Sequence, residues 1–238
     1  MNIPPVRAIV FWTAMACLWI GTVLAAGEPD SEEEPHSDAS ASLFNMPAET
    51  FFALESVGLP IDARRVDHTV LAAALFHETN LRRRQYGKHR LRHDPRLNAA
   101  ARMHAASMVR HNYLSHVDPY RPERRRPQDR ALLAGFEFGY LAENIATHFD
   151  IHYEAGREVY PVPEGSGLSY QAEGPPLPRH TYRSFAASLL AQWMNSPEHR
   201  HNILADQPEF LGADCRPQQE AASVHTFYCV QLFGSPPR

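Results

Sequence analysis

A chain of 238 residues with 44% hydrophobic and 21% charged residues can bury a sizeable core, which excludes the disordered and fibrous classes. Its net charge of −4 arises in the segment 28–38, which holds six acidic residues and no lysine or arginine. Because the rest of the chain is nearly neutral, we do not expect a nucleic-acid partner bound through bulk charge.

The first 27 residues predict a secretory signal peptide. Arg7 precedes an apolar run over 8–24, and three small residues follow at 25–27. This layout is typical of an export signal. An uncleaved membrane anchor is the alternative, because the length of the apolar run approaches the length of about 20 residues that a membrane-spanning helix needs. We expect a secreted or periplasmic protein with no integral membrane span after cleavage.

The mature chain is divided into a tether and one domain. Residues 28–47 begin with an acidic, Ser- and Pro-bearing stretch and are expected to be a disordered, solvated tether. Residues 48–238 are assigned to a single domain, interrupted at about 149–180 by a segment rich in proline and glycine in which no long element fits. A loop of this length is uncommon unless it is functional or disordered, and we interpret it as a flap.

Hydrophobic residues at helical spacing predict three helices, over about 67–85, 95–111 and 184–195. Ser196 and Pro197 then read as the N-cap and the first residue of a short fourth helix, with Glu198 and His199 in its first turn. The positive end of the helix dipole disfavours a charged imidazole at that position. A neutral imidazole is the form that binds a metal or accepts a proton.

Two predicted strands, 210–215 and 224–233, carry the two cysteines of the mature chain. In an antiparallel hairpin that closes near Ala222, Cys215 and Cys229 face each other, so a cross-strand disulfide is expected. Two separate buried thiols are the alternative. An oxidising compartment favours the disulfide.

Histidine and glutamate concentrate in three short segments, 111–116, 142–146 and 193–204. With 14 histidines in the chain, chance clustering is the alternative to a metal or catalytic site. His104 lies on an apolar helix stripe and is assigned to the core, whereas His201 is expected to face solvent. His148 and His152 begin the proline-rich segment, and we expect them at the surface. No glycine-rich phosphate loop and no His-Glu-x-x-His signature is present.

These segments resemble the motifs of the CAP superfamily (cysteine-rich secretory proteins, antigen 5, pathogenesis-related 1), and most of all those of its bacterial secreted branch. The resemblance implies an α+β fold, a three-layer α-β-α sandwich with a small, mainly antiparallel central sheet. The motifs occur in family order from about Val66 to Gly234: Asn80 with Arg82, Leu97–His104, Ser115–His116, Glu143–Ile145, Trp193–His199, Leu211–Gly212 and Gln231–Gly234.

The resemblance also implies a central cavity in which His116, His199 and Glu143 converge. Two imidazoles and one carboxylate are a ligand set that can hold a divalent metal such as zinc. Many family members carry a second glutamate after the tryptophan of the third helix, and Ser196 stands at about that position here. The four-residue constellation of the family is therefore incomplete in this chain.

Three functions are compatible with these residues. The first is a monomeric, non-enzymatic binding module at the cell envelope or outside the cell, with a lipid or an envelope glycan as its ligand. The second is a metal-assisted, protease-like hydrolase in which His116 and His199 hold the cation and Glu143 is the general base. The third is a structural domain with a vestigial site. Because a fold does not carry a reaction with it, we expect the binding module.

Overall fold

The computed structural model describes residues 38–162, 167–218 and 223–238. The expected signal peptide (1–27), the first part of the expected tether (28–37) and the hairpin turn near Ala222 lie outside the described residues. The helices are α1 (Asp38–Asn45), α2 (Ala48–Phe52), α3 (Glu55–Gly58), α4 (His68–Gln85), α5 (Pro95–His111), the 3-10 helix η1 (Pro122–Arg124), α6 (Pro127–Leu133), α7 (Tyr182–Asn195) and α8 (Pro197–Leu204). The strands are β1 (Arg92–His93), β2 (Tyr140–Phe149), β3 (Tyr160–Pro161), β4 (Leu168–Ser169), β5 (Phe210–Pro217) and β6 (Thr226–Ser235).

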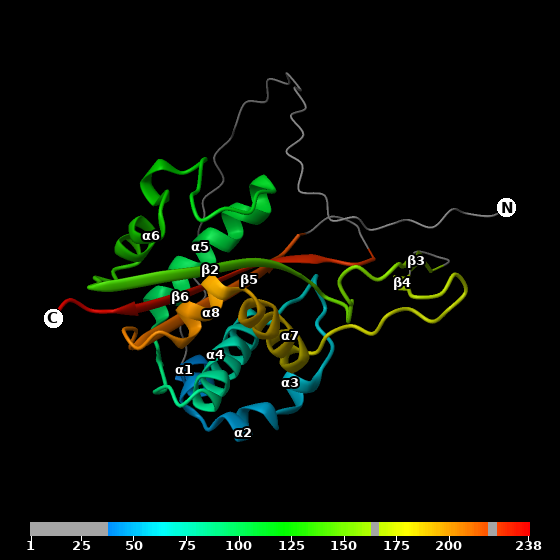
Figure 1. Ribbon diagram of the computed structural model, residues 1–238, viewed down its shortest axis with the longest axis horizontal. Helices are drawn as coiled ribbons and strands as arrows, with labels where there is room; N and C mark the ends of the chain where they lie inside the picture. The colour runs from blue at the N-terminus through cyan, green and yellow to red at the C-terminus, as the bar shows by residue number, and fades with distance from the viewer. Residues whose placement is uncertain (1–37, 163–166, 219–222) are drawn as a thin grey trace, which may run out of the picture.

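A four-stranded sheet in the order β1-β5-β6-β2 forms the middle layer, and β2 is one of its edges. The pairs β2–β6 and β5–β6 are antiparallel, and only the short pair β1–β5 is parallel. Helices α5 and α6 cover one face of the sheet, and α4, α7 and the N-terminal helices lie on the other (Figure 1). The expected three-layer α-β-α sandwich is confirmed.

The predicted helices are confirmed, and a polar side chain fixes the start of each long one. Asp67 caps α4 by accepting a hydrogen bond from the Val70 N–H at 2.9 Å, and Asp94 caps α5 in the same way from Arg96. Thr181 caps α7, which begins two residues earlier than expected. These contacts satisfy N–H groups that have no partner within their own helix.

Side chains alternate between the two faces of the sheet along the long strands, and this divides the core into two apolar clusters. On the α4 and α7 side the cluster includes Trp193 and Phe185, and on the α5 side it includes Leu97 and Phe136. Neighbouring β6 residues pack into opposite clusters, Cys229 into the first and Val230 into the second, as the period of two requires. Among the described residues, no helix combines the length and the apolar character that a membrane span requires.

The expected tether is wrong for residues 38–47, because α1 occupies most of this segment and packs on α4. Phe44 is buried and its ring stacks on that of His93, with 3.5 Å between ring centroids. The Nε2 atom of His77 is 2.7 Å from the carbonyl oxygen of Leu43. Contacts of Leu43 and Phe44 therefore hold α1 on the domain, since burying apolar side chains offsets the entropy of fixing the chain.

The proline-rich segment contains no long element among its described residues. Its secondary structure is the two-residue pair β3–β4 and a single bridge between Ile151 and Arg179. The segment projects from the end of β2 beside α7 (Figure 1). We refer to its described residues, 149–162 and 167–180, as the insertion.

The C-terminal hairpin confirms the cysteine prediction. Cys215 and Cys229 are register partners of β5 and β6, and their sulfur atoms are bonded. Nearer the start of β5, a Cβ on Gly212 would lie 2.2 Å from the backbone nitrogen of Asn98 in α5. Glycine therefore permits β5 and α5 to pack in direct backbone contact.

Candidate functional site

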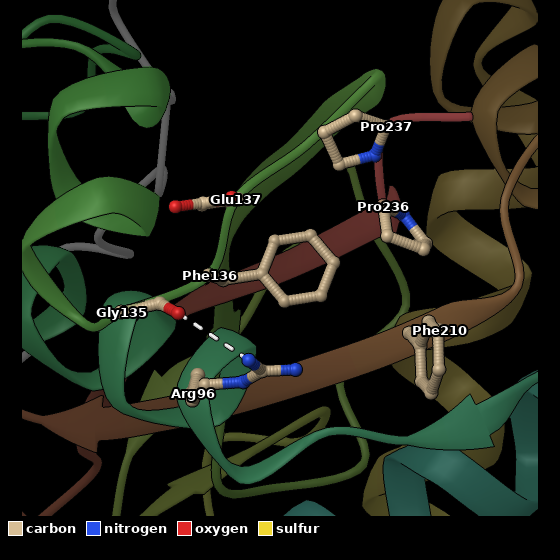
Figure 2. Close-up of a pocket in the computed structure, with 7 residues that line it drawn as sticks. All are labelled: Arg96, Gly135, Phe136, Glu137, Phe210, Pro236 and Pro237. Carbon is tan, nitrogen blue, oxygen red and sulfur yellow. Dashed lines mark hydrogen bonds between the residues drawn. The ribbon is translucent and has the colours of Figure 1, made fainter.

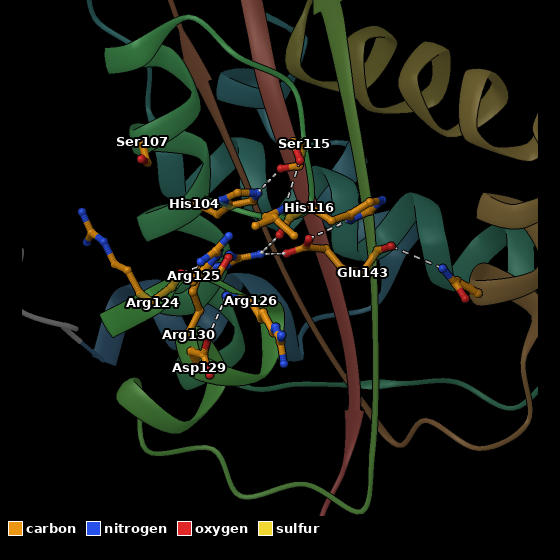
Figure 3. A network of polar contacts seen from close by, with 12 residues as sticks. His104, Ser107, Ser115, His116, Arg124, Arg125, Arg126, Asp129, Arg130 and Glu143 are labelled. Atoms are coloured by element: carbon orange, nitrogen blue, oxygen red, sulfur yellow. Dashed lines mark hydrogen bonds and ion pairs between the residues drawn. The ribbon is translucent and has the colours of Figure 1, made fainter. Parts of the chain in front are cut away.

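Three segments distant in sequence bring His116, Glu143 and Arg130 together at the edge of the sheet. His116 lies in the loop after α5, Glu143 on the edge strand β2, and Arg130 on α6. The Nδ1–H of His116 donates to Glu143 Oε1 at 2.9 Å, and Arg130 donates to Glu143 Oε2 at 2.7 Å. The imidazole and the guanidinium approach the carboxylate from two sides (Figure 3). The predicted pairing of His116 with Glu143 is thus present.

Arg130 is the residue that sequence reasoning missed. Its side chain is fully buried and also donates to the carbonyl oxygen of His116 at 3.1 Å and to those of Arg124 and Arg125 at 3.2 Å. The guanidinium therefore fixes the loop that carries His116 relative to β2. Nothing in its position distinguished it from the other arginines of the chain, because the contacts arise only when α6 packs beside β2.

Glu143 is held as a carboxylate. Burial raises its pKa, but the hydrogen bond from His116, the charge of Arg130 and the nearby imidazole of His104 act in the opposite direction and outweigh burial. The net result is a pKa below the ordinary value of a glutamate. Its side chain is 1% exposed, whereas that of His116 is 49% exposed. The acid is thus the buried support of the site, and the His116 imidazole is the part that solvent reaches.

His104 supports the same loop from the core. It is fully buried on α5, as expected, and its Nε2 atom lies 2.8 Å from the carbonyl oxygen of Ser115. Burial lowers the pKa of His104 to about 4, although Glu143 raises it, so the ring is neutral at neutral pH. The Ser115 hydroxyl oxygen accepts a hydrogen bond from the backbone N–H of Val117 at 3.1 Å.

His199 lies in the first turn of α8 and is positioned through its backbone. Asn144 donates to the His199 carbonyl oxygen at 3.2 Å, and Asn202 donates to the side-chain oxygen of Asn144 at 2.9 Å. The Asn144 amide also donates to Gln231, which donates to Thr79 in α4 at 2.8 Å. This chain of buried amides crosses the sheet and ties α8 to β2, β6 and α4.

The electrostatics of His199 agree in direction with the sequence expectation and differ in cause. Burial lowers its pKa, the nearby imidazole of His116 lowers it further, and Glu198 raises it. The two histidines are therefore close enough to influence each other, and His199 is neutral at neutral pH. His201, two residues further on, is exposed as expected.

Ser196 stands where α7 ends and α8 begins. Its backbone N–H donates to the Trp193 carbonyl at 3.1 Å, and its own carbonyl accepts from Arg200 at 2.9 Å. It occupies the N-cap position of α8, as expected, but its side chain makes no capping hydrogen bond. Ser196 thus shapes the turn that presents His199.

The residues do not form the expected three-ligand metal site. Both carboxylate oxygens of Glu143 are engaged, one by His116 and one by Arg130. Among the described residues, no group of three or more His, Cys, Asp or Glu side chains is arranged to hold a metal ion. The carboxylate orients His116 rather than offering an oxygen to a zinc ion, so we derive no reaction step through a metal.

A pocket of about 410 Å³ lies away from these residues, at the start of α5. Its floor is aromatic, and Arg96 donates to the Gly135 carbonyl at its rim (Figure 2). The charge of Arg96 is already compensated by Asp94 at 2.6 Å. The lining residues are Arg96, Gly135, Phe136, Glu137, Phe210, Pro236 and Pro237.

The sequence pattern of the cysteine-rich secretory protein family, CAP, matches residues 76–233. The chain belongs to the CAP family. The match begins within α4 and ends within β6, so the CAP domain contains the whole site, the insertion and the disulfide. The family resemblance that the motifs indicated is thereby confirmed.

Three solved structures are similar to the chain. An extracellular SCP-domain protein from Bacillus anthracis is 22% identical with a TM-score of 0.48, covering 70% of this chain and 41% of its own. An outer surface protein from Borrelia burgdorferi is 16% identical with a TM-score of 0.46, and the match covers 68% of this chain and 90% of that protein. A cysteine-rich secretory protein from Staphylococcus aureus is 13% identical with a TM-score of 0.43, and the match covers 71% of this chain and 40% of that protein. The chain thus spans less than half the length of the first and third proteins. No curated protein matches it.

Proposed function

We propose that this CAP domain is a non-enzymatic binding module that acts outside the cytoplasm, and that the exposed edge of His116 with the neighbouring His199 contacts its ligand. The observation that carries the proposal is the buried ion pair between Glu143 and Arg130, at 2.7 Å. This pair engages the Glu143 carboxylate in holding the loop that carries His116. What remains accessible is an imidazole surface that is already oriented, and preorganisation of this kind favours binding.

The alternative of a hydrolase requires Glu143 to act as a general base. An efficient base has a pKa near the working pH and an oxygen free to reach a water molecule. Glu143 has a lowered pKa, and both of its oxygens accept hydrogen bonds within the protein. The ion pair would have to break before proton transfer, and breaking a buried pair costs about 3–5 kcal/mol. These contacts favour the binding module over the protease-like reaction.

The chemistry of the site favours a hydroxyl-bearing ligand. His199 is neutral at neutral pH, and a neutral imidazole offers one donor and one acceptor nitrogen. Such groups suit the hydroxyls of an envelope glycan or of a lipid headgroup. Export is supported by the apolar run at 8–24 and by the disulfide, which forms and persists in oxidising compartments.

Binding of labelled glycan fragments and of lipid vesicles to the purified protein tests this proposal. We expect saturable binding of one class that weakens at least about tenfold in His116→Ala and in His199→Ala, because each substitution removes a hydrogen-bonding ring from the contact surface. His201→Ala is the matched control, since this histidine lies on the same short helix and is exposed. Turnover of casein or of a lipid ester that disappears in Glu143→Gln would refute the proposal and establish the hydrolase.

A further inference from the structure

A second histidine cluster joins the insertion to α7, separate from the site above. It consists of His148 at the end of β2 together with His152 and His180 in the two arms of the insertion. The rings of His152 and His180 are 3.8 Å apart between centroids, and those of His148 and His180 are 5.5 Å apart. His152 is exposed, as expected, whereas His148 is only half-exposed, because the chain returns at His180 and places a further ring beside it.

Polar contacts attach this cluster to α7, through Ser184 in the first turn and through Gln192 nearer the end of the helix. Ser184 Oγ lies 3.0 Å from His180 Nδ1 and 3.4 Å from His152 Nε2, and it also accepts from the Thr181 N–H as part of the helix cap. The Nδ1–H of His148 donates to Gln192 Oε1 at 2.8 Å, while its Nε2 atom is buried and has no hydrogen-bond partner among the described residues. The same few atoms thus hold both the insertion and the start of the helix.

Among the described residues around His180, no acid is placed to stabilise an added proton. The first turn of α7 carries no acidic residue and presents the positive end of its dipole. Asp150 is the acid beside the cluster, but Arg179 and His225 already share its carboxylate, and it meets His180 only through its backbone carbonyl at 2.8 Å. On α7, Arg183 adds a further positive charge and points to the ring of Phe52.

From this arrangement we infer that His148, His152 and His180 form a proton-sensitive latch, which fastens the insertion to the N-terminus of α7 at neutral pH and releases it in acid. Protonating His180 or His148 places a cation in a partly buried cluster of imidazoles, and His180 also lies at the N-terminus of α7. In the released state these two rings are hydrated and bind a proton without this penalty. Acid therefore favours the open form.

The sign and size of the effect follow from proton linkage. Burial, and then the imidazoles of His152 and His148, lower the pKa of His180 to about 3, and burial lowers that of His148 as well. The open state has the ordinary histidine pKa of about 6.5 and binds more protons, so latch stability is complete above that pH and is lost as the pH falls toward 3. For His180 alone, the opening equilibrium rises about 30-fold between pH 7.5 and pH 5.0.

Hydrogen exchange of the full chain, followed by mass spectrometry and corrected for the intrinsic pH dependence of exchange, tests the latch. We expect peptides from 149–155 and 176–184 to open about 30-fold more at pH 5.0 than at pH 7.5, while α4 stays protected. In His180→Gln the ratio of opening at pH 5.0 to opening at pH 7.5 should fall below about threefold, whatever the absolute protection of these peptides. In His152→Gln, which changes an exposed residue, the ratio should also fall, because one repulsive neighbour is removed.

His201→Gln is the control and should keep the full ratio, because this histidine is exposed on α8 and outside the cluster. A wild-type ratio near one would overturn the inference. So would an undiminished ratio in both His180→Gln and His152→Gln, or an equal loss of protection in α4, which would indicate global acid unfolding. Loss of ligand binding by His116→Ala has no bearing on these readouts, so the latch and the proposed function fail independently.

Discussion

Replacing Arg130 by methionine tests whether the Glu143–Arg130 ion pair organises the site. The substitution keeps the apolar stem of the side chain and removes the guanidinium, so that a carboxylate 1% exposed loses the partner of its Oε2 atom. Removing one member of a buried pair costs about 3–5 kcal/mol, because the remaining charge is left without compensation. At about 2–4 °C per kcal/mol for a domain of this size, the melting temperature should fall by roughly 6–20 °C.

Urea denaturation followed by the fluorescence of Trp193, which is fully buried, measures this change in the free energy of unfolding. The double variant Arg130→Met with Glu143→Leu is the control. Because it leaves no unpaired charge, it should recover most of the stability that the single variant loses. A loss under about 1 kcal/mol in Arg130→Met, or a double variant less stable than the single one, would refute the reasoning.

The pH dependence of the same variant supplies a second readout. In the wild type the pKa of Glu143 is lowered on folding, so its contribution to stability is present above pH 4.5 and is lost as the pH falls through the lowered value. In Arg130→Met, burial remains while the compensating charge is gone, so the pKa of Glu143 should rise above its ordinary value. The variant should then regain stability as the pH decreases, which is the opposite slope.

Three further predictions concern the disulfide, a close backbone contact and metal ions. Replacing Cys215 and Cys229 together by serine should lower the free energy of unfolding by about 3 kcal/mol, because the bridge closes a loop with a sequence separation of 14; an unchanged urea midpoint would contradict this. Gly212→Ala should lower the free energy of unfolding by about 3 kcal/mol or more, since the new Cβ would lie 2.2 Å from the backbone of α5. Gly58→Ala is the control and should change the free energy of unfolding little, because nothing lies within 4 Å of its Cβ position. Equal urea midpoints for the two variants would contradict this prediction. Dialysis against a chelator should leave the melting temperature unchanged, because the described residues include no three-ligand site. Zinc that raises the melting temperature in the wild type and not in His116→Ala would show that this view is mistaken.

Local features of the fold were predictable from the sequence. The helices α4, α5 and α7 follow from apolar residues at helical spacing, and their caps follow from Asp and Thr at the expected positions. The register of β5 on β6 follows from the alternation of the two strands, which is why Cys215 and Cys229 could be paired in advance. Helix α1 was not predicted, because Leu43 and Phe44 were too few to form a recognisable pattern next to an acidic stretch.

The candidate site was predictable only in part. The order of the motifs along the chain identified His116, Glu143 and His199, because the family pattern places these residue types at fixed points of the sequence. The assignment of Glu143 as a metal ligand did not anticipate that Arg130 takes one of its oxygens. Sequence spacing carries no information about this contact, since it depends on how α6 packs beside an edge strand.

The sequence by itself therefore determined what depends on neighbouring residues: helical and strand periodicity, the caps, the cysteine register and the family motifs. Only the tertiary structure decided which partner each buried polar group received. It joined Arg130 to Glu143 and His148 to His180, residues that lie on different elements. The physical reason is that a buried charge or imidazole must be satisfied by whatever group packing brings within reach, and packing is a property of the whole chain.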